Sequence, residues 1–191
     1  ANWRAASWQS AGILPAPLSQ REAQVVILTA RTGKWKGIFA EHMAILLKPR
    51  NAAGWTRYEV VGWGDPISKD GFVPDALWYG NTPRIVYSLT GLEAEALIPR
   101  IEASIARYPH HKRGSYTVWP GPNSNTFVSW IVRNTDGFGA ELPPAAVGKD
   151  WLGPAIGFDR APSNTGYSVS LAGLIGATLA WEEGAELHLL G

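Results

Sequence analysis

Short apolar runs separated by turn-forming residues organise the first part of the chain. Residues 24–30 form a continuous, β-branched run that predicts a buried strand, and residues 38–48 and 55–63 predict two more. We expect the second and third strands to pair antiparallel, because only the loop at 49–54 joins them. Residues 1–23 lack any period, so we expect them to form an extended arm over the domain.

Apolar residues at helical spacing predict two principal helices. The first covers about 92–108, and Pro99 within it should kink or restart the helix. The second runs from Ser124 to about Arg133, because Phe127, Trp130 and Ile131 recur at the i, i+3, i+4 spacing of one buried face.

The remaining segments read as loops with a few short strands. Residues 64–83 and 135–165 are rich in Gly and Pro and predict long connections. Residues 116–119 predict a short strand. Residues 167–180 and 186–190 predict a terminal hairpin, although the glycines of the first segment also suit a close-packed helix. These elements favour an α+β fold, with an antiparallel β-sheet and two principal helices.

Composition limits the function more than it limits the fold. The 191 residues are 46% apolar and carry a net charge of +1, which favours a single domain over 1–191 and argues against a nucleic-acid binder. The absence of Cys excludes disulfides, thiolate metal sites and Cys nucleophiles. No apolar run approaches the length of a membrane span, and no two His share a metal-ligand spacing. We predict neither a metal nor another cofactor.

The candidate chemistry centres on a proline-rich loop that opens the second helix. Pro120 and Pro122 keep the loop out of helical conformation, and Asn123 and Ser124 are both good N-caps. A hydroxyl at this position lies beside unpaired backbone N–H groups and the positive end of the helix dipole. A serine in this position can act as a nucleophile, although a serine that only caps the helix is the commoner case.

His42 is the imidazole that we select to work with this serine. It lies in a stretch otherwise suited to a core strand, where a His bonded to a backbone carbonyl is the usual arrangement. The next predicted strand carries Glu59, and its end carries Asp65. Either carboxylate could orient the ring, giving a Ser/His/acid arrangement. His188 and the Lys149–Asp150 pair are expected to be structural, the latter as a surface ion pair.

Several motifs together resemble a bacterial protein family catalogued only as a domain of unknown function. The matching stretches include Phe39-Ala40-Glu41-His42, Tyr58 to Gly64, Gly121-Pro122-Asn123-Ser124-Asn125-Thr126-Phe127 and Gly148-Lys149-Asp150. Members of that family often have an N-terminal hydrophobic leader, so the resemblance implies a cell-envelope location and membrane proximity through a removed leader. The first residue is Ala rather than Met, which fits a mature form and equally a cloning boundary.

The order of His42, Glu59 and Asn123-Ser124-Asn125-Thr126-Phe127 also resembles the permuted papain-like NlpC superfamily. The resemblance implies an NlpC-type architecture in which His42 is the base, Glu59 orients it and Ser124 is the nucleophile. Ser124 departs from the family pattern, because the superfamily has Cys there. A thiolate is pre-formed beside a His, whereas a serine hydroxyl must lose its proton during attack.

Two functions follow from these residues. The first is a cell-envelope hydrolase or acyltransferase acting on an amide or ester in a peptide, cell-wall or small-molecule substrate, with the Ser124 or Asn125 amide stabilising the oxyanion. Asn123, Asn125 and Asp65 are the further candidates for binding the substrate. The alternative is a catalytically inactive papain-like module that binds peptide, glycan or lipid.

Overall fold

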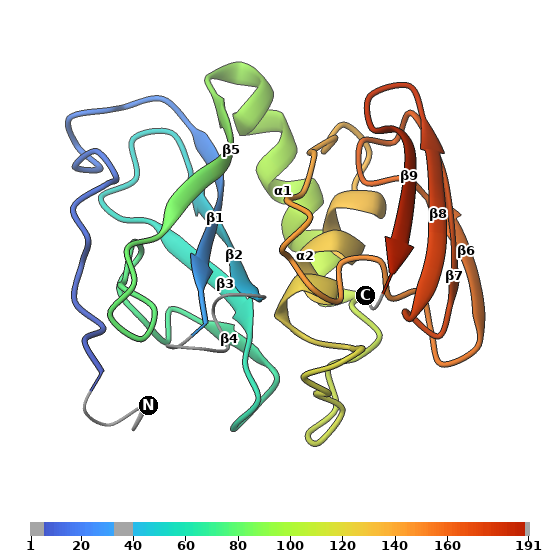
Figure 1. Ribbon diagram of the computed structural model, residues 1–191. Helices are drawn as coiled ribbons and strands as arrows, with labels where there is room; N and C mark the ends of the chain where they lie inside the picture. Colours follow the sequence, from blue (N-terminus) through green and yellow to red (C-terminus); the bar gives the residue numbers. More distant parts are fainter. Residues whose placement is uncertain (1–5, 33–39, 190–191) are drawn as a thin grey trace. The chain divides into compact units, whose positions relative to one another are not determined.

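The computed structural model describes residues 6–32 and 40–189 (Figure 1). These residues form antiparallel sheets and two principal helices, which confirms the α+β class. The chain divides into two compact units. We call residues 1–59 with 68–99 the first unit, and residues 60–67 with 100–191 the second unit, and describe each by itself.

A five-stranded antiparallel sheet in the order β4-β3-β2-β1-β5 forms the body of the first unit. Its strands are β1 (Gln24–Arg31), β2 (Glu41–Lys48), β3 (Thr56–Val60), β4 (Ile67–Lys69) and β5 (Arg84–Thr90). The first three fall in the predicted runs, and β2 and β3 pair antiparallel as expected. The predicted start of the second strand at Ile38 and Phe39 lies outside the described residues.

Strands β1 and β2 contain continuous apolar runs at residues 25–28 and 43–47, because the residues on both of their faces are buried. Val26 and Leu28 of β1 pack with Ala44 and Leu46 of β2, and Ile13 and Leu14 of the N-terminal arm cover this cluster. Asp75 fixes the arm in place: its Oδ2 accepts a hydrogen bond from the Ile13 backbone N–H at 2.8 Å. In the described residues 6–23 the arm forms no named strand or helix, in keeping with its irregular sequence.

Strand β5 was not predicted. It pairs antiparallel with β1 at the edge of the sheet, with a register shift between Ile27 and Leu28. Most of its residues are exposed or half-buried, so it lacks the apolar run that marks the central strands.

Both predicted helices are present. Helix α1 (Leu92–Ala106) runs through Pro99 without a restart, and helix α2 (Ser124–Arg133) has the predicted bounds. Neither helix is long and apolar enough to cross a membrane, and no other described segment is such a helix. The strand predicted at 116–119 is wrong: this segment is irregular, and the Thr117 N–H bonds the Pro122 carbonyl within the proline loop.

The second unit contains a four-stranded antiparallel sheet in the order β6-β7-β8-β9 (Figure 1). Its strands are β6 (Ile156–Arg160), β7 (Gly166–Leu171), β8 (Ile175–Ala180) and β9 (Gly184–Leu189). The segment predicted as one strand at 167–180 is two strands, because Ala172 and Gly173 adopt positive φ values of 53° and 74° and turn the chain. Strand β9 was predicted, whereas β6 was missed within the Gly/Pro-rich connection.

Candidate functional site

A buried histidine–carboxylate pair joins two neighbouring strands of the first unit. His42 Nε2 on β2 lies 2.5 Å from Glu59 Oε2 on β3, and the side chains are 5% and 0% exposed. The strand register pairs Leu46 with Arg57. Because alternate residues of a strand share a face, His42 and Glu59 project to the same side of the sheet. Glu59, one of the two predicted orienting acids, is therefore the carboxylate that contacts His42.

Two further side chains fix this pair in place. Arg57 donates from Nε to Glu59 Oε1 at 2.7 Å and from Nη2 to Glu59 Oε2 at 2.9 Å, a bidentate geometry that holds the carboxylate plane. Arg57 Nη1 bonds the Pro74 carbonyl at 2.9 Å. Trp78 stacks on the imidazole, with ring centroids 3.7 Å apart and planes within 1°. The imidazole is thus held in both position and tilt.

The protonation states follow from the surroundings. Burial alone would raise the pKa of Glu59, but the hydrogen bonds from His42 and Arg57 and the charge of the Arg57 guanidinium outweigh it and lower the pKa to about 2. Burial lowers the pKa of His42 below its ordinary value, with Glu59 opposing that shift. Near neutral pH the pair is therefore an ionised carboxylate and a neutral imidazole. Since a carboxylate only accepts hydrogen bonds, Nε2 carries the proton and Nδ1 carries the lone pair.

Ser124 is the first residue of α2, in the second unit, and is 4% exposed. Asn123 is the N-cap and forms a reciprocal capping box with Thr126. Asn123 Oδ1 accepts from the backbone N–H groups of Asn125 at 2.9 Å and Thr126 at 3.1 Å. The predicted loop-to-helix junction is confirmed, with Asn123 rather than Ser124 as its cap. The Asn125 amide already donates within this cap, so the Ser124 amide is the remaining oxyanion donor of the two considered.

The other side-chain atoms of the motif bind the protein's own backbone. Asn123 Nδ2 donates to the carbonyls of Val118 and Val147, both at 3.0 Å, and Asn125 Nδ2 donates to Val147 at 2.9 Å. Thr126 Oγ1 donates to the Gly148 carbonyl at 2.7 Å. These contacts give Asn123 and Asn125 a structural role, clamping the segment 147–149 against the start of α2.

Gly148 is required for this close approach. Its φ is +94°, and a Cβ built there would lie 2.3 Å from Asn123 Nδ2. Further along the helix, Ser129 Oγ and Arg133 Nη1 both donate to the Lys149 carbonyl, at 2.6 and 3.0 Å. The Asn-Ser-Asn-Thr and Gly-Lys-Asp motifs, distant in sequence, therefore form one interlocked structure.

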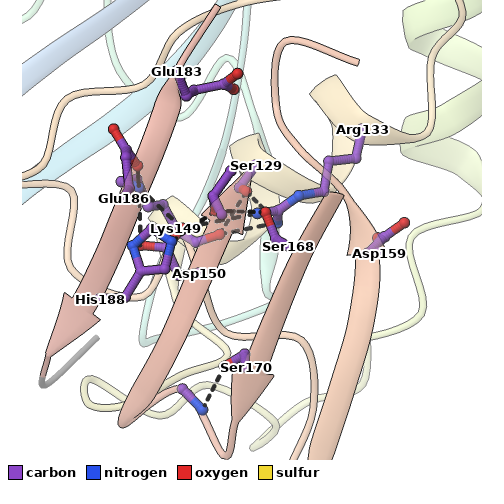
Figure 2. A network of polar contacts seen from close by, with 12 residues as sticks. Ser129, Arg133, Lys149, Asp150, Asp159, Ser168, Ser170, Glu183, Glu186 and His188 are labelled. Atoms are coloured by element: carbon purple, nitrogen blue, oxygen red, sulfur yellow. Dashed lines mark hydrogen bonds and ion pairs between the residues drawn. The ribbon is translucent and has the colours of Figure 1, made fainter. Parts of the chain in front are cut away.

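The hydrogen bonds to residues 147–149 position Lys149 and Asp150 within a buried polar network (Figure 2). Lys149 Nζ lies 2.9 Å from Asp150, whose Oδ2 lies 3.0 Å from His188 Nδ1 on β9. His188 Nε2 lies 2.7 Å from Thr178 Oγ1 on β8. The predicted ion pair of Lys149 and Asp150 is confirmed, but its surface location is wrong, because both side chains are less than a tenth exposed.

The buried charges of this network are stabilised by opposite charges and hydrogen bonds from neighbouring groups. Burial alone would raise the pKa of Asp150, but the hydrogen bond with His188 and the charge of Lys149 lower it to about 2. Arg133, 2% exposed in its side chain, lies 3.9 Å from Asp150 and donates from Nε to the Arg160 carbonyl at 2.7 Å. The network thus ties α2 and residues 147–150 to the second sheet.

Asp65, the other predicted acid, lies at the surface of the second unit. Its side chain is 85% exposed and lies 3.3 Å from Arg113. Among the residues 6–32 and 40–189, no group of three His, Asp or Glu side chains is arranged to hold a metal ion.

The structure brings together His42 and Glu59, and separately Asn123, Ser124 and Asn125 at the start of α2. Sequence reasoning missed Arg57 and Trp78. Arg57 had a readable signal, since it lies two residues before Glu59 and must share its face of a strand. Trp78 had none, because it lies in a long connection whose path only the folded chain defines.

Taken together, these features define an α+β protein with a carboxylate-bound histidine in one sheet and an asparagine-capped serine at the start of a buried helix. The chain belongs to the family described as protein of unknown function DUF3750, whose model matches residues 22–151. That span includes all six predicted site residues and ends before β6. No curated protein and no solved structure matches the chain.

Proposed function

We propose that this protein is a hydrolase or acyltransferase that acts on an amide or ester, with His42 as general base, Glu59 as its orienting carboxylate and Ser124 as nucleophile. The observation that carries the proposal is the His42–Glu59 pair, a neutral imidazole whose tautomer is fixed by an ionised carboxylate. Such a pair is the base half of a Ser/His/acid mechanism.

The reaction follows from the proton positions. Ser124 Oγ attacks the substrate carbonyl carbon while His42 Nδ1 takes the hydroxyl proton, and the oxyanion is stabilised by the Ser124 amide at the helix N-terminus. Glu59 stabilises the resulting imidazolium. When the tetrahedral intermediate collapses, the bond to the leaving group breaks and the imidazolium donates its proton to that amine or alcohol. Water or an acceptor alcohol or amine then releases the acyl group from Ser124.

The order of these residues along the chain supports a permuted papain-like arrangement as the setting for this chemistry. His42 on β2, Glu59 on β3 and the Asn123-capped start of α2 follow the NlpC-type order. We propose a cell-envelope location and a peptide, cell-wall or small-molecule substrate on the same resemblance.

One observation favours a second candidate, a catalytically inactive module that binds peptide, glycan or lipid. Ser124 stands where the papain-like pattern has Cys, and its 4% exposure limits the access of a substrate. A hydroxyl in that setting is a weaker nucleophile than a thiolate.

A serine-reactive fluorophosphonate separates the two candidates. Ser124 and His42 belong to different compact units. Labelling of Ser124, and its dependence on His42, therefore tests whether the two residues act together. We expect the wild-type protein to gain one phosphonyl group on the peptide that contains Ser124. The Ser124→Ala and His42→Ala variants should lose labelling, while Ser19→Ala, at an exposed serine of the arm, should keep it.

The proposal fails if the folded wild-type protein is not labelled, or if Ser124→Ala is labelled as fast as the wild type. In either case the binding module is the better description. Circular dichroism and the urea midpoint of each variant establish that a loss of labelling is not a loss of folding.

A further inference from the structure

The second sheet has an exposed face that is almost wholly apolar. Strand pairing aligns Ile156, Leu171, Ile175 and Leu189 in one row across the four strands, and Phe158, Val169, Ala177 and Leu187 in the next. We call this the outer face. Its large side chains are between 42% and 92% exposed; they are Ile156, Phe158, Tyr167, Val169, Leu171, Ile175, Leu179, Leu187 and Leu189, with Trp181 directly after β8.

The opposite face of the same sheet is small and polar. Ser168, Thr178 and His188 project from it and join the hydrogen-bonded network with Asp150 (Figure 2). The usual arrangement of a two-layer domain, with the apolar face inside and the polar face in water, is therefore reversed here. The polar layer already satisfies its own hydrogen bonds, so the unpartnered surface of this sheet is its apolar one.

The outer face is too large to be ordinary surface. Ten large side chains, each exposed by roughly two-fifths or more, amount to on the order of 1,000 Å² of apolar area. Monomeric proteins rarely expose a contiguous apolar patch above a few hundred Å². A stable protein–protein interface buries about 800 Å² on each partner.

We infer that the outer face binds the same face of a second copy of this chain, sheet against sheet across a two-fold axis. A two-fold contact needs one patch that is complementary to itself, and the two rows that begin at Ile156 and Phe158 carry no charged side chain, which meets that need. The central strands carry the smaller Val169 and Ala177, while the edge strands carry Phe158 and Leu187. Two such faces pack about 10 Å apart with their side chains interleaved.

The charges at the margin favour a protein partner over a lipid surface. The turn from β8 to β9 carries the exposed Glu182, whereas Glu183 accepts hydrogen bonds from Ser163 and Glu186 lies on the opposite face of the sheet, 3.8 Å from Lys149 Nζ. Arg160 at the end of β6 lies 3.8 Å from Asp136. Surfaces that bind anionic membranes carry an excess of Lys and Arg, whereas this margin carries Glu182 as well as Arg160 and has no such excess.

Sedimentation equilibrium of the full chain tests the inference. We expect the wild-type protein to sediment at twice the chain mass at micromolar concentration. Leu187→Glu, at an 84% exposed position on β9, should halve that mass and leave the circular dichroism spectrum unchanged. Leu92→Glu, at a 77% exposed position on α1, is the matched control and should remain dimeric.

A second variant keeps the inference testable if Leu187→Glu unfolds. Because the chain has no Cys, Ala177→Cys introduces a single thiol on the outer face, and a bifunctional maleimide that spans about 10 Å should convert it into a covalent dimer, whereas Leu92→Cys should not cross-link. A monomeric wild-type protein overturns the inference, and so does a dimer in which Ala177→Cys fails to cross-link. Binding of that monomer to vesicles of phosphatidylcholine and phosphatidylglycerol, lost in Leu187→Glu, would assign the face to membrane instead.

Discussion

His42 and Glu59 lie 2.5 Å apart on neighbouring strands, with both side chains buried in the first unit. The contact depends on the antiparallel register, because a slip of one residue would turn Glu59 to the opposite face of the sheet. Arg57 adds a bidentate ion pair on the same carboxylate. Glu59 therefore contacts two buried side chains, His42 and Arg57, and its removal should leave both without their carboxylate partner.

Glu59→Gln tests that dependence. The variant keeps the shape of the side chain but leaves the Arg57 guanidinium buried without its counter-charge. We expect the free energy of unfolding to fall by about 3 kcal/mol or more, as when one member of a buried ion pair is removed. Urea denaturation measures the change, with Glu102→Gln on the exposed face of α1 as the control. Equal midpoints for the two variants would mean that Glu59 does not stabilise Arg57.

Stability should fall as the solution becomes acidic. The folded pKa of His42 is lowered, so below its ordinary value of 6.5 the unfolded chain takes up a proton that the folded chain resists. The folded pKa values of Glu59 and Asp150 are about 2, against ordinary values of 4.5 and 3.8. We expect the urea midpoint to be nearly constant between about pH 7.5 and about pH 9, to decline as the pH falls through 6.5, and to fall most steeply from pH 4.5 toward pH 2.

The Asp150→Asn variant measures how much of the stability lost at low pH comes from Asp150 in the second unit. It removes a group whose folded pKa is depressed, so unfolding free energy should depend less steeply on pH below 3.8 than in the wild type. Asp65→Asn, at an 85% exposed side chain, should leave the slope unchanged. If Asp150→Asn and the wild type have parallel curves, the carboxylate is not stabilised by Lys149 and His188 in the folded state.

Asn123 has two structural roles that can be tested separately: Oδ1 caps α2, and Nδ2 donates to two backbone carbonyls. Asn123→Ala removes both the cap and the two Nδ2 donations, and we expect a loss of about 2 kcal/mol or more. Asn123→Asp keeps an oxygen for capping but loses the donations to Val118 and Val147, so its loss should be smaller. Asn134→Ala, at the exposed C-cap, is the control. Thermal unfolding of the three variants should rank Asn123→Ala as the least stable.

Gly148→Ala tests the close approach between the two motifs. The substitution places a Cβ 2.3 Å from Asn123 Nδ2 at a φ of +94°, so we expect a loss of more than about 1 kcal/mol. Gly64→Ala is the matched control, because Gly64 also has a positive φ, +68°, but has open space around its Cα. A comparable loss in both variants would attribute the effect to backbone strain alone. The difference between their urea midpoints measures the steric part.

Local patterns predicted the elements whose signals are contained in a few consecutive residues. The buried run of β1 and the helical spacing of α2 gave bounds close to those observed, since burial of a whole strand or of one helical face is written directly into the residue types. Strands β4, β5 and β6 escaped prediction for the opposite reason. They are edge strands with exposed positions, and their pairing partners lie far away in the chain or across an irregular connection.

The sequence by itself determined the α+β class, the start of α2 at a capped proline loop, and the selection of His42, Glu59 and Ser124 as candidates. Tertiary structure alone decided that Glu59 contacts His42, that Asn123 clamps residues 147–149, and that Lys149 and Asp150 are buried with His188. The physical reason is range. Caps and periodic faces depend on neighbours within a turn or two, whereas register, burial of charge and the reversed polarity of the second sheet depend on segments that meet only in the folded chain.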